Sequence, residues 1–303
     1  MLLRAVRTIS RPVVWGLGRI KWEQASAFGR CLGFLAYTFS RRYRNVAVEN
    51  LLIAFPGMTR AEAKSTAKQT FCNFCRGFVE FFIVARFSGE DIKRVVEVRG
   101  LEHADEALRA GNGGIFVTAH IGNWEAFARR VALEGYPITV IARNSDDPTS
   151  TGMVNEIRER GGYKVLSRDE SVRGALRCLR SNEFLGILPD QNTYGGTVFV
   201  PFFGRPVATA TGVAVFALKT GAPILPAFTT WDEATKQYIA TIYPPLETPL
   251  TGDMDRDVEA ITAAYTAAIE AEVRKSPAEW LWLHNRWKRT HEADKAPRVR
   301  SGS

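Results

Sequence analysis

The fold of this chain is decided by the stretch Gly113-Gly114-Ile115-Phe116-Val117-Thr118-Ala119-His120-Ile121-Gly122-Asn123-Trp124-Glu125. The largely apolar run 115–119 predicts a short buried β-strand that ends at His120. Asn123 is a good helix N-cap, so Glu125 falls in the first turn of a helix that continues to Leu133 and stops before Gly135. The stretch therefore predicts a strand, a polar turn and a helix, which is the repeating unit of an α/β domain.

His120 and Glu125 are the candidate catalytic pair. Residues five positions apart on one helix point about 140° apart, so the two side chains are expected to meet only if His120 ends the strand. A histidine held by a carboxylate removes the proton from a hydroxyl group, which then attacks an acyl thioester. The helix N-terminus favours an ionised Glu125 and offers N–H groups to a developing oxyanion. The alternative is a histidine packed at a strand end beside an ordinary acidic residue.

Strands and helices alternate along the rest of the chain. The expected strands are 115–119, 138–142, 164–166, 184–188, 224–228 and 238–243. The expected helices are 123–133, 155–160, 171–179, 213–219 and 254–274, preceded by a helical region over 46–98 with a capping box at Thr59–Glu62. This order predicts an α/β fold with a mostly parallel central sheet flanked by helices. Functional side chains are then expected at the carboxyl ends of the strands.

Polar residues follow two further strands directly. Arg143 and Asn144 follow the strand 138–142, where an arginine is suited either to a phosphate or developing anion or to a structural salt bridge. Asp190 and Gln191 follow the strand 184–188, and Asp190 is expected to orient Arg143, to bind substrate hydroxyls or to cap a loop. The substrate-binding residues expected from the sequence are Asn123, Arg143, Asn144, Asp190, Gln191 and Arg205.

The segment 198–205 is unusually apolar for a connection between elements. It reads Val-Phe-Val-Pro-Phe-Phe-Gly-Arg and ends at Arg205. An ordinary exposed loop would carry more polar residues, so the segment is expected either to line an acyl channel or to pack in the core.

The composition favours an anionic partner. The chain has 303 residues and a net charge of +8, from 40 basic and 32 acidic residues. It carries no helix-turn-helix, RNA-binding or zinc signature, so a nucleic-acid partner is not expected. Cys72 and Cys75 lie in a helical run with no second pair, so they are expected in the core and no metal or cofactor is predicted.

Residues 1–45 are predicted to form a basic amphipathic helical region that associates with a membrane. Nine arginines and lysines alternate there with aromatic and aliphatic residues, against Glu23 as the single acid. The alternative is an amphipathic helix that covers the domain core. No signal peptide and no uncharged apolar run of about 18 residues is evident. Residues 46–290 are expected to form one α/β domain, and residues 291–303 a disordered tail.

Four blocks of the sequence, taken in this order, resemble the late acyltransferases of lipid A biosynthesis, the lauroyl and myristoyl transferases. The first block runs from Arg41-Arg42-Tyr43-Arg44-Asn45 to Phe55-Pro56, and the second is Thr118–Glu125, with the spacing His-x4-acid. The third joins Asp190-Gln191 to Val200–Gly204 and Thr209–Gly212, and the fourth is Trp280–Lys288. The resemblance covers nearly the whole chain. One departure is Arg30, which interrupts the apolar N-terminal stretch that family members use as a membrane span.

The resemblance implies a glycerolipid-acyltransferase-like enzyme on the cytoplasmic face of the bacterial inner membrane. It implies transfer of a fatty acyl chain from acyl carrier protein, or from coenzyme A, to a hydroxyl of a lipid A precursor or a similar anionic glycolipid. By the same match His120 is the base, Glu125 its partner, Arg143 and Asp190 are supporting residues, and no metal takes part. The alternatives are a lipid acyl hydrolase, in which the same pair activates water, and a non-catalytic lipid-binding membrane protein.

Overall fold

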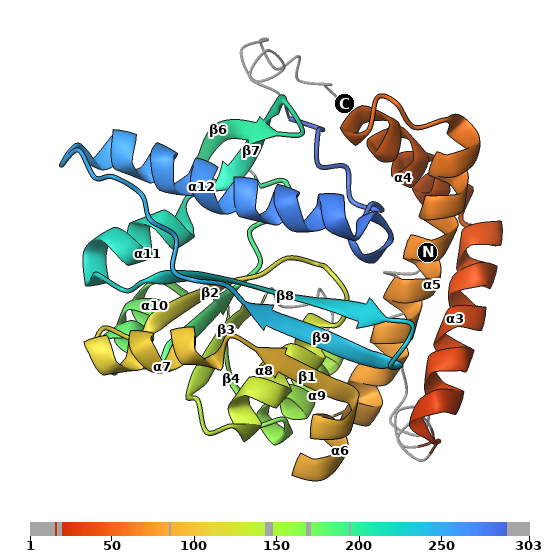
Figure 1. The fold of residues 1–303 in the computed structure, drawn as a ribbon, viewed down its shortest axis with the longest axis horizontal. Helices are drawn as coiled ribbons and strands as arrows, with labels where there is room; N and C mark the ends of the chain where they lie inside the picture. Colours follow the sequence, from red (N-terminus) through yellow and green to blue (C-terminus); the bar gives the residue numbers. More distant parts are fainter. Residues whose placement is uncertain are drawn as a thin grey trace.

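The computed structural model describes Gly16 and residues 20–84, 86–142, 148–167, 171–193 and 195–289, without the side chains of residues 148–150 and 171. Helices lie on both faces of a twisted central sheet, and a long helical layer closes one side of it (Figure 1). The observed architecture is the α/β fold with a mostly parallel sheet that the alternation of strands and helices predicts.

Seven strands form the central sheet, in the order β1-β9-β8-β2-β5-β3-β4. Their bounds are β1 (Val96–Arg99), β2 (Gly114–Val117), β3 (Ile138–Ala142), β4 (Lys164–Ser167), β5 (Phe184–Ile187), β8 (Ile224–Asp232) and β9 (Gln237–Ile242). All neighbouring pairs are parallel except β8 and β9, which form an antiparallel hairpin. Strands β2 and β5 are direct neighbours, so the residues that follow them meet at one edge of the sheet.

Four of the predicted helices, 123–133, 171–179, 213–219 and 254–274, match observed helices at both ends to within one residue. The predicted helix 155–160 is the C-terminal part of a longer helix, and the helix 101–110 is not among the predicted ones. The bounds of the observed helices are α3 (Trp22–Phe39), α4 (Arg41–Ala54), α5 (Arg60–Val84), α6 (Gly89–Val95), α7 (Leu101–Ala110), α8 (Trp124–Leu133), α9 (Pro148–Arg160), α10 (Ser171–Arg180), α11 (Gly212–Thr220) and α12 (Met254–Lys275). The capping box is confirmed, because Thr59 and Glu62 exchange side-chain and backbone hydrogen bonds before α5. The expectation that 46–98 is helical is wrong at its end, where Val96–Arg99 pairs with β9 as strand β1.

The apolar strand before His120 is buried on both faces of the sheet. Ile115 and Val117 point into a core beneath α11 and α12, whereas Phe116 points into a second core beneath α6, α7 and α8. In that second core the Phe116 ring stacks on Phe184 with 4.3 Å between centroids. A strand covered on both sides requires apolar residues at successive positions, which explains the unbroken apolar run Ile115–Val117.

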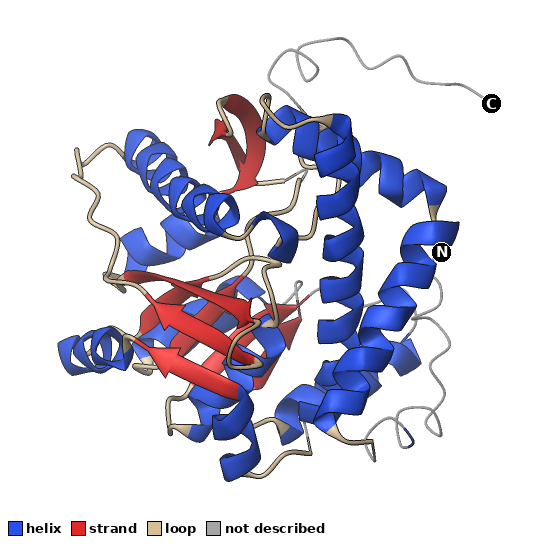
Figure 2. Cartoon of the chain, turned by 45° about the vertical axis from the view of Figure 1, so that its right-hand side comes forward, coloured by secondary structure: helices blue, strands red, loops and turns tan. Residues whose placement is uncertain are grey.

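Two long helices, α3 and α5, pack side by side at one edge of the molecule (Figure 2). Gly29 and Gly33 of α3 allow this close approach. A Cβ atom added at Gly33 would lie 2.4 Å from the Phe71 carbonyl oxygen and from the Cys72 Cα. Helix α3 is therefore fixed along α5 by close backbone contact, to which side-chain contacts such as that of Tyr37 with Phe71 are added.

Part of the apolar segment 198–205 packs in the core, which is one of the two alternatives expected for it. The segment forms the antiparallel hairpin of β6 (Thr197–Phe202) and β7 (Arg205–Ala210). Phe202 and Phe203 are buried and contact three tryptophans near the C-terminal end of the described chain, Trp280, Trp282 and Trp287. These aromatic contacts tie the hairpin to the segment that also supplies Trp280 to the candidate site.

The structure describes only part of the N-terminal region 1–45, which is predicted to associate with a membrane. Residues 1–15, 17–19 and the tail from residue 290 lie outside the described residues. Within the described ranges no helix combines the length and the apolar character needed to cross a membrane.

Substituting Gly33→Ala is expected to lower the free energy of unfolding by about 1–3 kcal/mol, because the new methyl group collides with the backbone of α5. Gly89→Ala is the matched control, since no atom lies within 4 Å of the added Cβ at the start of α6. Urea unfolding of both variants measures the difference. Equal stability of Gly33→Ala and wild type would contradict the close packing described above.

Candidate active site

His120 lies at the carboxyl end of β2, in the turn that leads to α8. Its backbone carbonyl accepts a hydrogen bond from Leu281 N at 3.0 Å. Asp190 follows the neighbouring strand β5 after a short connection. The parallel pairing of β2 with β5 therefore brings a histidine and an aspartate to the same sheet edge from distant parts of the sequence.

Asp190 holds both the ring and the backbone of His120. His120 Nδ1 lies 2.8 Å from Asp190 Oδ1, and the His120 backbone N–H donates to Asp190 Oδ2 at 2.9 Å. Because a carboxylate accepts hydrogen bonds, this contact places the proton of a neutral imidazole on Nδ1 and leaves the lone pair on Nε2. The arrangement is that of a histidine prepared to act as a general base.

The Asp190 carboxyl is fully enclosed and yet ionised. Burial alone would raise its pKa, but the electrostatic interaction with the His120 ring, the hydrogen bonds from that ring and from the His120 backbone, and the hydrogen bond from Trp280 outweigh burial and hold the pKa at about 2. Trp280 Nε1 donates to Asp190 Oδ2 at 2.9 Å. In the sequence Trp280 belongs to an aromatic segment, and no local pattern indicates that it is a member of this site.

Two further side chains surround the imidazole. The Gln191 amide nitrogen lies 3.3 Å from His120 Nε2, and the Trp124 ring meets the His120 ring edge-on with 4.9 Å between centroids. The His120 side chain remains 21% exposed. The imidazole is thus partly accessible, with the Gln191 amide beside Nε2.

Glu125 does not form the expected contact with His120. Among the described residues its carboxylate is bound by Arg158 of α9, which donates from Nε and Nη2, and by the Tyr163 hydroxyl at 2.7 Å. Burial raises the pKa of Glu125, but the charge and hydrogen bonds of Arg158 outweigh it, so the net pKa is lowered. The carboxylate that contacts His120 is Asp190, a residue expected to bind substrate or to orient Arg143.

Asn123 caps α8 as predicted, but both ends of its amide are occupied by protein groups. Asn123 Oδ1 accepts from Ala126 N at 3.0 Å, and Asn123 Nδ2 donates to Glu80 Oε2 at 3.1 Å. This arrangement differs from the expected substrate-binding role. Asn123 instead fixes the first turn of α8, which carries Trp124 and Glu125.

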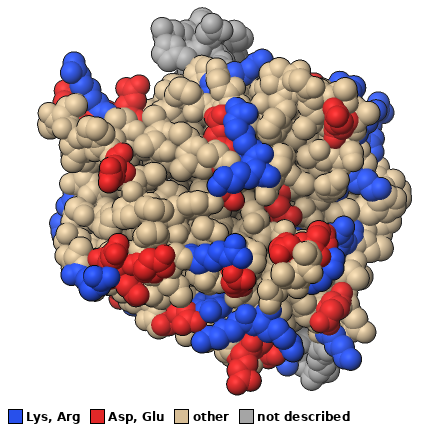
Figure 3. Space-filling model, in the orientation of Figure 1, with Lys and Arg blue, Asp and Glu red and all other residues tan. Residues whose placement is uncertain are grey.

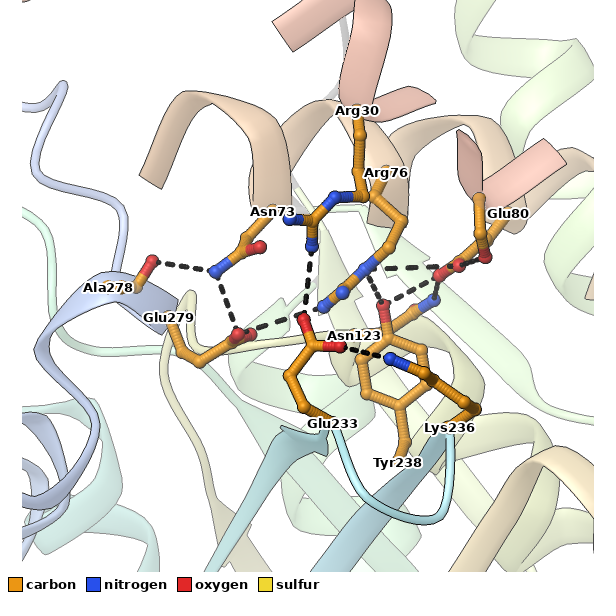
Figure 4. A network of polar contacts seen from close by, with 11 residues as sticks. Arg30, Asn73, Arg76, Glu80, Asn123, Glu233, Lys236, Tyr238, Ala278 and Glu279 are labelled. Atoms are coloured by element: carbon orange, nitrogen blue, oxygen red, sulfur yellow. Dashed lines mark hydrogen bonds and ion pairs between the residues drawn. The ribbon is translucent and has the colours of Figure 1, made fainter. Parts of the chain in front are cut away.

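Glu80 belongs to a buried polar network behind the site (Figure 4). Its carboxylate accepts from the Tyr238 hydroxyl at 2.6 Å and from the Ser26 hydroxyl at 2.5 Å. Arg76 lies between two carboxylates, with Nε 3.9 Å from Glu80 Oε1 and Nη2 3.7 Å from Glu279 Oε1. Burial raises the pKa of Glu80, and burial likewise raises the pKa of Glu279 to about 7 despite the opposing charge of Arg76.

This network is joined to the active site through the backbone. Gly122 N donates to the Glu279 carbonyl oxygen at 3.1 Å, and Glu279 is followed directly by Trp280. The sequence offered one signal for it, because Glu80 is the single charge in the apolar run 77–85. A charge at such a position is expected to be buried with a partner.

An apolar cavity of about 190 Å³ lies next to the site, between α5, α8 and α9. Phe74, Phe78 and Phe81 of α5 line it from one side, and Trp124 lines it where α8 begins. Glu125 and Arg158 form a polar part of the wall. Since Trp124 also contacts the His120 ring, the cavity and the imidazole are separated by a single side chain.

The other predicted site residues are placed as follows. Arg143 and Asn144 lie outside the described residues. Arg205 begins β7, where it pairs with Phe202 in the hairpin, and it is exposed. Among the described residues, the hydrogen bonds of His120 and Asp190 do not involve Arg205, so the structure does not bring it into this cluster.

Asp190→Asn is expected to lower the free energy of unfolding at neutral pH by roughly 2 kcal/mol, as the depressed pKa implies. Because the pKa of Asp190 is lower in the folded state than in the unfolded chain, its carboxylate stabilises the fold above the ordinary pKa of 3.8. This stabilisation is lost as the pH falls through about 2. The difference from wild type should therefore shrink in acid. Urea unfolding at neutral and acidic pH tests this.

Asp255→Asn, on the exposed start of α12, is the matched control and should stay within about 0.5 kcal/mol of wild type. A stability difference between Asp190→Asn and wild type that is the same at both pH values would contradict the ionised state assigned to Asp190.

Comparisons with known proteins agree with the sequence motifs. The profile of a family described as bacterial lipid A biosynthesis acyltransferase matches residues 12–289. The lipid A biosynthesis lauroyltransferase of Escherichia coli K12 is 27% identical over 279 residues, 91% of this chain and 89% of that protein. The phosphatidylinositol mannoside acyltransferase of Mycobacterium tuberculosis H37Rv is 28% identical over 194 residues, 63% and 59% of the two chains. His120 and Asp190 both lie within the profile match.

Proposed function

Since this chain belongs to the bacterial lipid A biosynthesis acyltransferase family, and is therefore an acyltransferase, we propose that it moves a fatty acyl chain from a thioester to a hydroxyl of a lipid A precursor or a related anionic glycolipid. The proposed donor is acyl carrier protein or acyl coenzyme A. The proposed location is the cytoplasmic face of the bacterial inner membrane. The observation that carries the proposal is the His120–Asp190 pair at the sheet edge beside an apolar cavity.

His120 is the proposed catalytic base. Nε2 takes the proton of the acceptor hydroxyl while Asp190 holds Nδ1–H and stabilises the imidazolium that forms. The alkoxide oxygen attacks the thioester carbonyl carbon, and a tetrahedral oxyanion results. Collapse of this intermediate breaks the C–S bond, and the imidazolium returns its proton to the leaving thiolate. The products are an ester and a free thiol.

Helix α8 supplies the proposed oxyanion site. Its N-terminus starts next to His120, and its first-turn N–H groups carry the positive end of the helix dipole. Glu125 is a positioning residue in this proposal, since its carboxylate fixes Arg158 and Tyr163 against the first turn of α8. The ion pair also keeps a guanidinium at the cavity wall without leaving an unpaired buried charge.

The apolar cavity is the proposed site for the acyl chain. Phenylalanine rings of α5 form one wall of the cavity, and they offer no hydrogen bonds to water, so an apolar chain is favoured there. The cavity lies one side chain away from the proposed base. An acyl chain in this cavity would place its thioester carbonyl near Trp124 and the start of α8. Burial of each methylene then contributes about 0.8 kcal/mol to donor binding.

His120→Ala is expected to lower kcat/KM for acyl transfer by about 10²–10⁴-fold, and Asp190→Asn by about 10²-fold or more, because each removes part of the base. Purified protein in detergent is assayed with an acyl thioester and a lipid A precursor. Acylated acceptor and free fatty acid are quantified separately, which distinguishes transfer from hydrolysis. Full activity of His120→Ala would exclude this mechanism.

Glu125→Gln is the comparison that separates the two carboxylates. It should reduce activity by leaving Arg158 buried without its anion, but the acid limb of the pH profile of kcat/KM should stay in place. For Asp190→Asn that limb should move to lower pH, because loss of the adjacent anion disfavours the protonated imidazole. If instead the acid limb moves in Glu125→Gln and stays in place in Asp190→Asn, Glu125 is the partner of the base.

Gly77→Leu should shorten the acyl chains that the enzyme prefers. A Cβ at Gly77 would lie 3.6 Å from the Gly122 carbonyl oxygen, so alanine fits, whereas a leucine extends into the cavity. Each displaced methylene should cost about fourfold in kcat/KM. Competition among thioesters of graded length measures the preference, with Gly77→Ala as the control. An unchanged preference in Gly77→Leu would place the acyl chain elsewhere.

A further inference from the structure

One exposed arc of α3 is free of charge. Eight exposed residues occupy one arc of the helix, roughly 140° wide at 100° per residue. They are Gln24, Ala27, Phe28, Cys31, Phe34, Leu35, Thr38 and Phe39, and are called here the outer stripe. The exposed charges Glu23 and Arg30 lie together at one edge of this arc. A solvent-facing helix surface normally carries charges, so the outer stripe is suited to a less polar neighbour.

The apolar members of the stripe are well exposed. Phe28, Phe34 and Leu35 are 45%, 46% and 43% exposed, and Phe39 is 75% exposed. The other exposed large hydrophobic residues of the described chain are Leu133, Val172, Leu250 and Met254, which lie on α8, on α10 and around the start of α12. The concentration on one helix distinguishes the stripe from the scattered apolar residues of an ordinary surface.

The inner side of α3 packs tightly against the rest of the protein. Gly29 and Gly33 hold it against the backbone of α5. At its C-terminal end, the Arg44 guanidinium binds the carbonyl oxygens of Tyr37 and Thr38 at 3.2 and 3.1 Å. The stripe is therefore presented lengthwise, as the outer surface of a fixed helix.

Positive charges surround the stripe. Lys21 precedes the helix, Arg41 and Arg42 follow Phe39, and all three are exposed. The Lys68 ammonium lies 4.7 Å from the centre of the Phe34 ring. Over the described residues 20–48, Glu23 is the single acidic side chain. Along the lower part of the face drawn in Figure 3, by contrast, acidic and basic side chains lie close together.

We infer that the outer stripe of α3 lies in the headgroup region of an anionic lipid bilayer, with the helix axis parallel to the membrane plane. The aromatic and aliphatic side chains enter the boundary between headgroups and acyl chains, and the flanking cations contact lipid phosphates. This deepens the proposed function, on which it rests for the identity of the membrane as the one that holds the acceptor lipid. It assigns the membrane contact to a surface of the described residues.

Vesicle sedimentation of the full chain tests the inference. The triple variant Phe34→Ser/Leu35→Ser/Phe39→Ser should bind vesicles of phosphatidylcholine and phosphatidylglycerol at least about 30-fold more weakly than wild type, since three apolar contacts are lost. The matched control is Val172→Ser/Leu250→Ser/Met254→Ser, whose residues are 59%, 62% and 51% exposed, and it should bind like wild type. Arg41→Gln/Arg42→Gln should weaken binding to the anionic vesicles but not to pure phosphatidylcholine.

Acyl transfer in detergent micelles separates this inference from the proposed function. The stripe variant should keep wild-type transfer to a micellar acceptor and wild-type thermal unfolding, because its three residues are exposed and distant in sequence from His120. Wild-type vesicle binding by the stripe variant would overturn the inference. So would a concentration-dependent dimer of the wild type that the stripe variant loses, since a second copy would then cover the stripe.

Discussion

The site depends on one buried carboxylate. Asp190 is bound by three donors at once, namely the His120 ring, the His120 backbone and the Trp280 indole. An ionised group without water is tolerated only when such donors replace its solvation. Because the donors come from the turn after β2 and from the segment after α12, the same carboxylate ties the central sheet to the C-terminal aromatic cluster. The geometry of the candidate site and the contact between the sheet and this cluster thus depend on the same group.

Helix α5 extends this coupling to the N-terminal region, because it presents a different chemistry on each of three faces. Phe74 and Phe78 line the cavity, Gly77 lies against the turn that carries Asn123, and Glu80 binds the Asn123 amide. A third face lies against α3, where the glycines of that helix meet its backbone. A displacement of α5 would alter the cavity wall, the cap of α8 and the position of the outer stripe together.

The sequence predicted the parallel sheet and most element boundaries, because buried strands and capped helices leave strong local patterns. It also placed His120 and Asp190 correctly at the ends of strands. Their contact could not be predicted, since it depends on β2 and β5 being neighbours in the sheet, and strand order is not written in local periodicity. The expected pairing with Glu125 failed for a related reason. Glu125 lies in the first turn of α8 as predicted, but its side chain is directed to α9, where Arg158 supplies a full opposite charge.

The buried charges of the Arg76 network contribute more to the positions of neighbouring side chains than to the free energy of unfolding. One guanidinium faces two carboxylates, Glu80 and Glu279, and burial raises the pKa of both acids. A hydrophobic replacement of equal volume would often be as stable. An apolar cluster, however, could not hold the Asn123 amide in one orientation, because dispersion contacts have no direction. The Asn123 amide donates to Glu80 and accepts from Ala126 N, and these directional hydrogen bonds transmit that orientation to the first turn of α8. The network therefore contributes most where the position of Trp124 beside His120 must be fixed.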